Sequence, residues 1–189
     1  LRTMVSRVDG VVVADQVEEA ECGVITGRVR AAIGNLALRH PQVVFAADSR
    51  TRIGLHQHVI VMPNAREAVL AVRPGWSGEV GLELARECGA KLSRWTGRPV
   101  FLTIGDQGML VFTESGTEHV PGVPVSGQID IVGAGDSAMA GVVSALCGGA
   151  CPGEAAVIGN LVASVTIQQV GATGTATPEQ VREQFQRLA

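Results

Sequence analysis

The chain contains no tyrosine, and all aromatic residues together make up only 3% of its 189 residues. A surface that stacks the bases of single-stranded nucleic acid needs exposed aromatic side chains, so this composition argues against one. The formal net charge is −3 and no basic stripe is present, which excludes a nucleic-acid partner bound by general electrostatics. Because aromatic residues are so few, the core must be aliphatic.

Metal-binding cysteine pairs are also missing. The four cysteines include no Cys-x-x-Cys pair, and no histidine stands at a zinc-binding spacing from them. We expect reduced, mostly buried thiols in a cytoplasmic protein. No apolar run reaches the roughly 18 residues that cross a bilayer, so we expect neither a signal peptide nor a membrane partner.

Strand-like and helix-like segments alternate along the chain. Short aliphatic runs predict strands at 11–14, 43–47, 59–62 and 99–103, and a hairpin at 108–121. Apolar periodicity predicts helices at 25–39, 64–72, 78–96, 135–146, 152–170 and 178–188. This order predicts an α/β fold with a mostly parallel sheet, helices on both faces and a small antiparallel hairpin. With no repeat or linker, we expect a single domain over residues 1–189.

The most informative stretch is Asp-Ile-Val-Gly-Ala-Gly-Asp at 130–136. Its small residues, Gly133, Ala134 and Gly135, precede an expected helix, whose free N-terminal N–H groups form an anion site. A carboxylate at Asp136 would repel an anion, but it suits a hydroxyl group that is about to attack a phosphoryl group. A glycine-rich turn capped by an aspartate is the structural alternative.

Two further motifs favour the functional interpretation. Thr103, Gly105 and Gly108 form a glycine-rich turn after an expected strand, where open α/β sheets bind ligands. Asn64 and Glu67 lie three residues apart at the start of an expected helix and share one of its faces. Their oxygen atoms suit a hard cation such as Mg²⁺, often bound through water.

Together these motifs resemble those of the ribokinase-like (PfkB) carbohydrate kinase family. The 130–136 run is similar to the family signature Asp-Thr-x-Gly-Ala-Gly-Asp, Asn64 and Glu67 to its Asn-x-x-Glu motif, and the 103–108 turn to its Thr-x-Gly-x-x-Gly motif. Near the end, the segments 159–163 and 171–175 resemble the family's asparagine-containing helix and Gly-Ala turn. Residues 11–26 and 47–50 look most like the heptose-phosphate kinase branch.

The resemblance implies a kinase that uses ATP and Mg²⁺ to phosphorylate a sugar or sugar phosphate. Asp136 would be the catalytic base, and Gly133, Ala134 and Gly135 would form the anion hole for the transferred phosphoryl group. Positioning and electrostatics would supply most of the acceleration.

The resemblance also assigns the remaining site residues. Thr103, Gly105 and Gly108 would hold the phosphates and ribose side of the nucleotide, and Asn160 would lie near the adenine. Asn64 and Glu67 would position magnesium and phosphate through water. Asp130 would help to hold a monovalent cation such as K⁺, although Ile131 replaces the threonine of the signature and removes its hydroxyl.

The chain resembles only the C-terminal part of the family. The missing part would carry most sugar contacts, so we expect a homodimer or a longer parent chain. Two alternatives stay open: a truncated, non-catalytic nucleotide-binding fragment or regulatory relative, and a kinase of a nucleoside or vitamin-precursor alcohol. Arg50, Arg52 and Arg66 lie near the expected ligand edge, where they would meet a substrate phosphate or remain solvated.

Overall fold

The computed structural model describes residues 1–188. They divide into two compact units, of which the first comprises residues 1–104 and 110–118 and the second residues 105–109 and 119 onward. The single domain expected over residues 1–189 stays a prediction.

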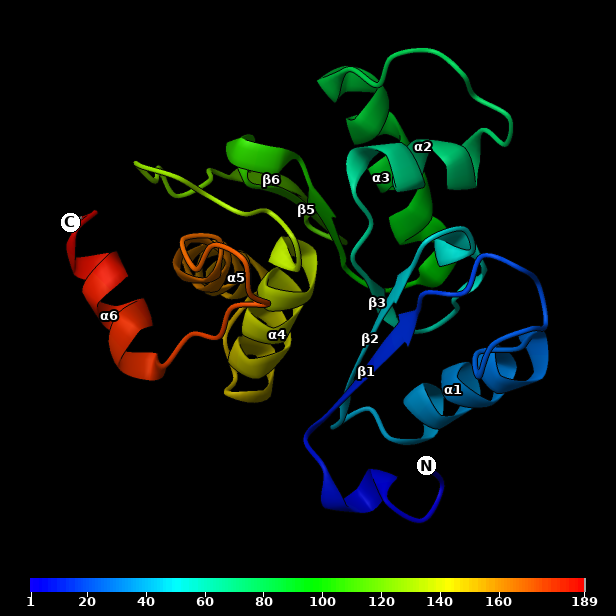
Figure 1. Cartoon of the computed structure of the whole chain (residues 1–189). Coiled ribbons are helices and arrows are strands. Elements are labelled where there is room, and N and C mark those ends of the chain that lie inside the picture. The colour runs from blue at the N-terminus through cyan, green and yellow to red at the C-terminus, as the bar shows by residue number, and fades with distance from the viewer. Residues whose placement is uncertain (189) are drawn as a thin grey trace. The chain divides into compact units, whose positions relative to one another are not determined.

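Six strands form one sheet in the order β1-β2-β3-β4-β5-β6 (Figure 1). They are β1 (Gly10–Asp15), β2 (Val44–Ser49), β3 (Ile60–Val61), β4 (Val100–Thr103), β5 (Met109–Thr113) and β6 (Gly116–Val120). The first four run parallel, with Gly10 opposite Val44 and Val61 opposite Val100. An antiparallel pair completes the sheet, so the predicted α/β fold is confirmed.

Three helices of the first unit cover one face of this sheet: α1 (Gly27–Arg39), α2 (Ala65–Val72) and α3 (Leu82–Thr96). Parallel strands in sequential order, joined by right-handed crossovers, place their helices on the same side. The core between them is aliphatic, as the composition predicts, with Phe45 and Phe112 as its two aromatic side chains among the buried residues. Gly89 of α3 lets Phe112 approach, because a Cβ at position 89 would lie 2.3 Å from its ring.

Helix boundaries differ from the prediction where the backbone is extended. Helix α3 begins at Leu82 and not at 78, because Gly81 is its extended N-cap (φ −79°, ψ 163°). By contrast, α6 (Pro178–Gln186) begins as predicted: Thr177 accepts a hydrogen bond from the Gln180 N–H, and proline occupies the first turn.

The second unit contains α4 (Ala134–Cys147), α5 (Pro152–Thr166) and α6, and the first two of these pack closely. Glycines make this approach possible. A Cβ on Gly141 would lie 3.0 Å from the Cα of Gly159, and a Cβ on Gly159 would lie 2.7 Å from Val142 Cγ2. The chain therefore has no room for larger side chains where α4 crosses α5.

The cysteines correct one expectation. Cys88 is buried in α3, whereas Cys22, Cys147 and Cys151 are exposed. The reason is position, because Cys147 ends α4 and Cys151 is the N-cap of α5, and both flank a glycine-rich turn. Within residues 1–188, no helix has the length and apolarity needed to cross a membrane.

Candidate active site

A buried polar cluster lies at the carboxyl ends of β1 and β2. Asp15 ends β1 and is 2% exposed, and its Oδ2 accepts a hydrogen bond of 2.8 Å from Ser49 Oγ at the end of β2. Arg52 Nη2 lies 3.0 Å from Asp15 Oδ1, and Arg52 Nη1 donates to the Glu18 carbonyl at 2.7 Å. Burial opposes ionisation of Asp15, but the hydrogen bonds from Arg52 and Ser49 outweigh it and lower the pKa.

His56 is buried beside this cluster, directly after the 3₁₀ helix η2 (Ile53–Leu55). Its Nε2 atom has no hydrogen-bond partner among the described residues. Burial, reinforced by the positive charge of Arg30, lowers the pKa of His56 from 6.5 to about 4, against the opposing influence of Asp15. The ring is therefore neutral at pH 7.

Asn64, Glu67 and Thr103 lie close together in the first unit. Asn64 is the N-cap of α2, where its Oδ1 accepts from the Glu67 N–H and Glu67 Oε2 accepts from the Asn64 N–H, each at 2.9 Å. Thr103 ends β4, forms a bridge to Asn64 and donates its N–H to the Pro63 carbonyl at 2.9 Å. The helix cap and the strand end thus form one edge.

Glu67 has an environment that suits a cation. Burial raises its pKa, and the charge of Asp48 raises it further, while the hydrogen bond from Asn64 and the charge of Arg50 lower it. A bound cation would offset the negative charge of Asp48 that opposes ionisation of Glu67. Within residues 1–188 no group of three or more histidine, cysteine or acidic side chains is placed to hold a metal ion, so the assignment of Asn64 and Glu67 to Mg²⁺ stays a prediction.

Gly108 and Asn160 contact a single backbone segment, 119–122, in the second unit, whereas the space around Gly105 is open. Both glycines have positive φ angles, and a Cβ on Gly108 would lie 2.3 Å from the Val120 carbonyl. Asn160, which is 8% exposed on α5, donates through Nδ2 to the carbonyls of Val120 (3.2 Å) and Pro121 (2.9 Å). The amide of Asn160 therefore holds the 119–122 segment against α5.

Asp130 fixes the turn that leads into α4. Its Oδ1 accepts from the Val132 N–H at 3.0 Å and its Oδ2 from the Gly171 N–H at 3.1 Å. The hydrogen bond from Val132, followed by that from Gly171, lowers the pKa of Asp130. The carboxylate thus joins the 130–136 turn to the 171–175 turn.

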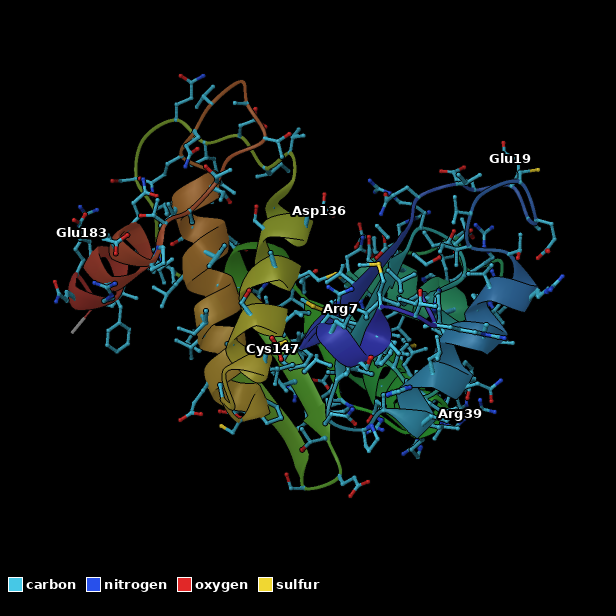
Figure 2. The ribbon with its side chains drawn as sticks, turned by 90° about the horizontal axis from the view of Figure 1, so that it is seen from below. Arg7, Glu19, Arg39, Asp136, Cys147 and Glu183 are labelled. Carbon is cyan, nitrogen blue, oxygen red and sulfur yellow. The ribbon has the colours of Figure 1, made fainter. Side chains whose placement is uncertain are left out.

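The predicted anion hole lies directly after this carboxylate. Gly133 adopts a left-handed conformation (φ 79°, ψ 4°) as the N-cap of α4, which glycine accepts at little cost. Ala134, Gly135 and Asp136 form the first turn. The Ala134 N–H donates to the Ile131 carbonyl at 3.1 Å, which leaves the N–H groups of Gly135 and Asp136 at the N-terminus of the helix. Asp136 is exposed at one end of α4, with Cys147 at the other (Figure 2). A phosphoryl group at these N–H groups would lie beside a carboxylate.

Sequence reasoning missed the cluster of Asp15, Ser49, Arg52 and His56. Its members lie up to 41 positions apart, and of the four only Arg52 was placed near the expected ligand edge, as a candidate phosphate ligand and not as the partner of Asp15. Gln16 was also missed: its Nε2 donates to Asp48 Oδ2 and its Oε1 accepts from Arg50 Nε, both at 2.8 Å.

Comparison with protein families gives a match over residues 28–180 to the pfkB family carbohydrate kinase model. Among curated proteins, the bifunctional protein HldE of Azorhizobium caulinodans is 29% identical over 85% of this chain and 33% of its own length. The inositol 3-kinase of Zea mays is 36% identical over 38% of this chain and 19% of its own length. The chain spans about a third of the length of the HldE relatives.

Solved structures share the fold. Ribokinase from Thermotoga maritima superposes with a TM-score of 0.73 at 21% identity, covering 97% of this chain and 59% of ribokinase. Phosphofructokinase-2 from Escherichia coli, in complex with potassium, gives a TM-score of 0.75 at 18% identity, covering 98% of this chain and 60% of that enzyme.

Proposed function

Because this chain belongs to the pfkB family of carbohydrate kinases, we propose that it is the nucleotide-binding and catalytic part of an enzyme that transfers a phosphoryl group from ATP to a hydroxyl of a sugar or sugar phosphate. The single observation that carries the proposal is the exposed Asp136 in the first turn of α4, directly after the small residues 133–135.

We assign Asp136 as the base that takes the proton of the acceptor hydroxyl. Its carboxylate would accept this proton as the acceptor oxygen attacks the γ-phosphorus and the bond to the ADP leaving group breaks. The N–H groups of Gly135 and its neighbours would stabilise the charge that develops on the transferred phosphoryl group. The base and the N–H groups would thus both come from the first turn of α4.

The other predicted site residues are assigned to binding and positioning the nucleotide and its metal ion. Thr103, Gly105 and Gly108 are assigned to the nucleotide phosphates and ribose side, and Asn160 to the adenine side. Bound Mg²⁺ would neutralise charge on the phosphate oxygens, and Asn64 and Glu67 would hold its waters. A K⁺ ion near Asp130 would be bound mainly by carbonyl groups of the turn, since both carboxylate oxygens already accept backbone N–H groups.

The test compares ATP consumption by the whole chain and its Asp136→Asn variant, with Mg²⁺ and a panel of sugars, sugar phosphates and nucleosides. We expect turnover with an acceptor of the first two classes and a loss of at least about 100-fold in the variant. Binding of an ATP analogue, measured by calorimetry, should be retained. Asp9→Asn, which changes an exposed aspartate before β1, is the matched control.

The outcomes separate the alternatives. Wild-type turnover by Asp136→Asn would refute the assigned base, and turnover of nucleosides alone would identify a different acceptor class. ATP-analogue binding without any turnover would favour a non-catalytic part that needs a longer parent chain or a homodimer. The coverage of only a third of the HldE relatives is the observation that favours this second candidate.

A further inference from the structure

The three arginines near the carboxyl edge have different surroundings in the first unit. Arg52 is engaged by Asp15 and by the carbonyls of Val17 and Glu18. Arg66, exposed on α2, makes no side-chain hydrogen bond or ion pair within residues 1–188. Arg50 is also exposed, but it is held in place, since its Nε donates to Gln16 Oε1 at 2.8 Å.

Arg50 is linked to Asp48 through the amide of Gln16. Its positive charge lowers the pKa of the Glu67 carboxyl, whereas the charge of Asp48 raises it. The amide of Gln16 stands between these charges, because its Nε2 donates to Asp48 Oδ2 while its Oε1 accepts from Arg50. A neutral amide thus bridges a carboxylate and a guanidinium group.

Gln16 is itself fixed by its neighbours in the chain. It follows Asp15, which is buried against Arg52 and Ser49, and it precedes Val17, whose carbonyl Arg52 also binds. Arg52 therefore holds the backbone on both sides of Gln16 in place, and Gln16 in turn orients Arg50 through its hydrogen bond.

The remaining donors of Arg50 are the terminal NH₂ groups of its guanidinium. No residue in the described part of the chain accepts a hydrogen bond from them. A planar guanidinium offers parallel N–H donors that match the oxygen atoms of a phosphate. We propose that Arg50, positioned by Gln16, binds a phosphate oxyanion of the ligand beside Glu67. This inference rests on the proposed function, because it takes that ligand to be a phosphoryl donor or acceptor.

The phosphate could come from the nucleotide or from a sugar phosphate. Calorimetry on the whole chain would distinguish the two, with MgATP as one probe and glucose 6-phosphate and fructose 6-phosphate without nucleotide as the others. The variants are Arg50→Gln, which keeps length and polarity, Gln16→Leu, which removes the bridge, and Arg39→Gln as the matched control on an exposed arginine in the last turn of α1. Thermal melting would establish that each variant is folded.

We expect Arg50→Gln to weaken binding of one probe class by about 10- to 100-fold, the effect of losing charged hydrogen bonds. Gln16→Leu should weaken binding of the same probe by several-fold, since the guanidinium of Arg50 remains but is less ordered. Arg39→Gln should leave binding within about twofold. Weaker binding of MgATP would show that Arg50 contacts the phosphoryl donor. Weaker binding of a sugar phosphate would show that it contacts the phosphoryl acceptor.

Two results would overturn the inference while leaving the proposed function standing. One is unchanged binding of every probe by Arg50→Gln in a chain that binds MgATP. The other is an equal loss in Arg50→Gln and Arg39→Gln, which would indicate only a general effect of positive charge. If the wild-type chain binds none of the probes, the inference and the proposed nucleotide site both fail.

Discussion

Arg52, in the segment that follows β2, and Asp15, the last residue of β1, form an ion pair of 3.0 Å, with side-chain exposures of 10% and 2%. A charge so enclosed is costly when its partner is removed, because the remaining ion cannot be solvated. The pair also ties the end of the edge strand β1 to its neighbour in the sheet.

Replacing Arg52 should therefore destabilise the fold. We expect Arg52→Met to lower the free energy of unfolding by about 3–5 kcal/mol, measured by urea denaturation. Arg66→Met, on an exposed arginine, should change it by no more than about 0.5 kcal/mol. Adding Asp15→Asn to Arg52→Met should recover part of the loss, and equal stabilities of the two single variants would contradict the prediction.

Stability should depend on pH through His56. Since the folded protein holds the pKa of this ring at about 4, against 6.5 for an unperturbed ring, the unfolded chain binds more protons between these values. The neutral ring contributes its full stability above pH 6.5, and we expect roughly 3 kcal/mol to be lost as the pH falls to 4. Denaturation across this range would measure the slope.

Two variants identify the source of that slope. His56→Phe removes the titrating ring and should flatten the dependence of stability on pH between 6.5 and 4. His40→Gln, at the end of α1, should leave it unchanged. A slope that survives in His56→Phe would assign it to other groups.

Gly108 should be sensitive to a single added carbon. Its φ of +93° already disfavours alanine, and a Cβ would lie 2.3 Å from the Val120 carbonyl and 2.4 Å from the Gly122 nitrogen. Gly97→Ala provides the comparison, because position 97 has a φ of +64° but open space around it. We expect Gly108→Ala to cost about 1–3 kcal/mol more than Gly97→Ala in unfolding experiments, and equal costs would show that the segment 119–122 yields easily.

Much of the fold follows from local patterns in the sequence. The capping box of Asn64 and Glu67 and the cap of α6 at Thr177 are short-range contacts, so residue type and spacing suffice to predict them. The start of α3 was placed four residues early because apolar periodicity continues before it, whereas the backbone at Gly81 is extended.

The site was harder to predict where partners are distant in sequence. Arg52 appeared to be a candidate phosphate ligand, yet its guanidinium is committed to Asp15, 37 positions earlier. Asn160 was matched to a motif, but no local pattern indicates that its amide holds the carbonyl of Val120 at the end of β6, 40 positions before it. Such contacts depend on which strands and helices become neighbours, and the composition of a segment does not encode that.

The glycine contact between Gly141 and Gly159 has a mechanical consequence for the turn that carries Asp136. With a helix backbone packed directly on another, α4 cannot slide along α5 without collision, so its axis behaves as a rigid rod. Upstream, Asp130 holds the 130–133 turn through the N–H groups of Val132 and Gly171, so the first turn of α4 is anchored on both sides. The carboxylate of Asp136 therefore stands on a backbone that has little freedom to move.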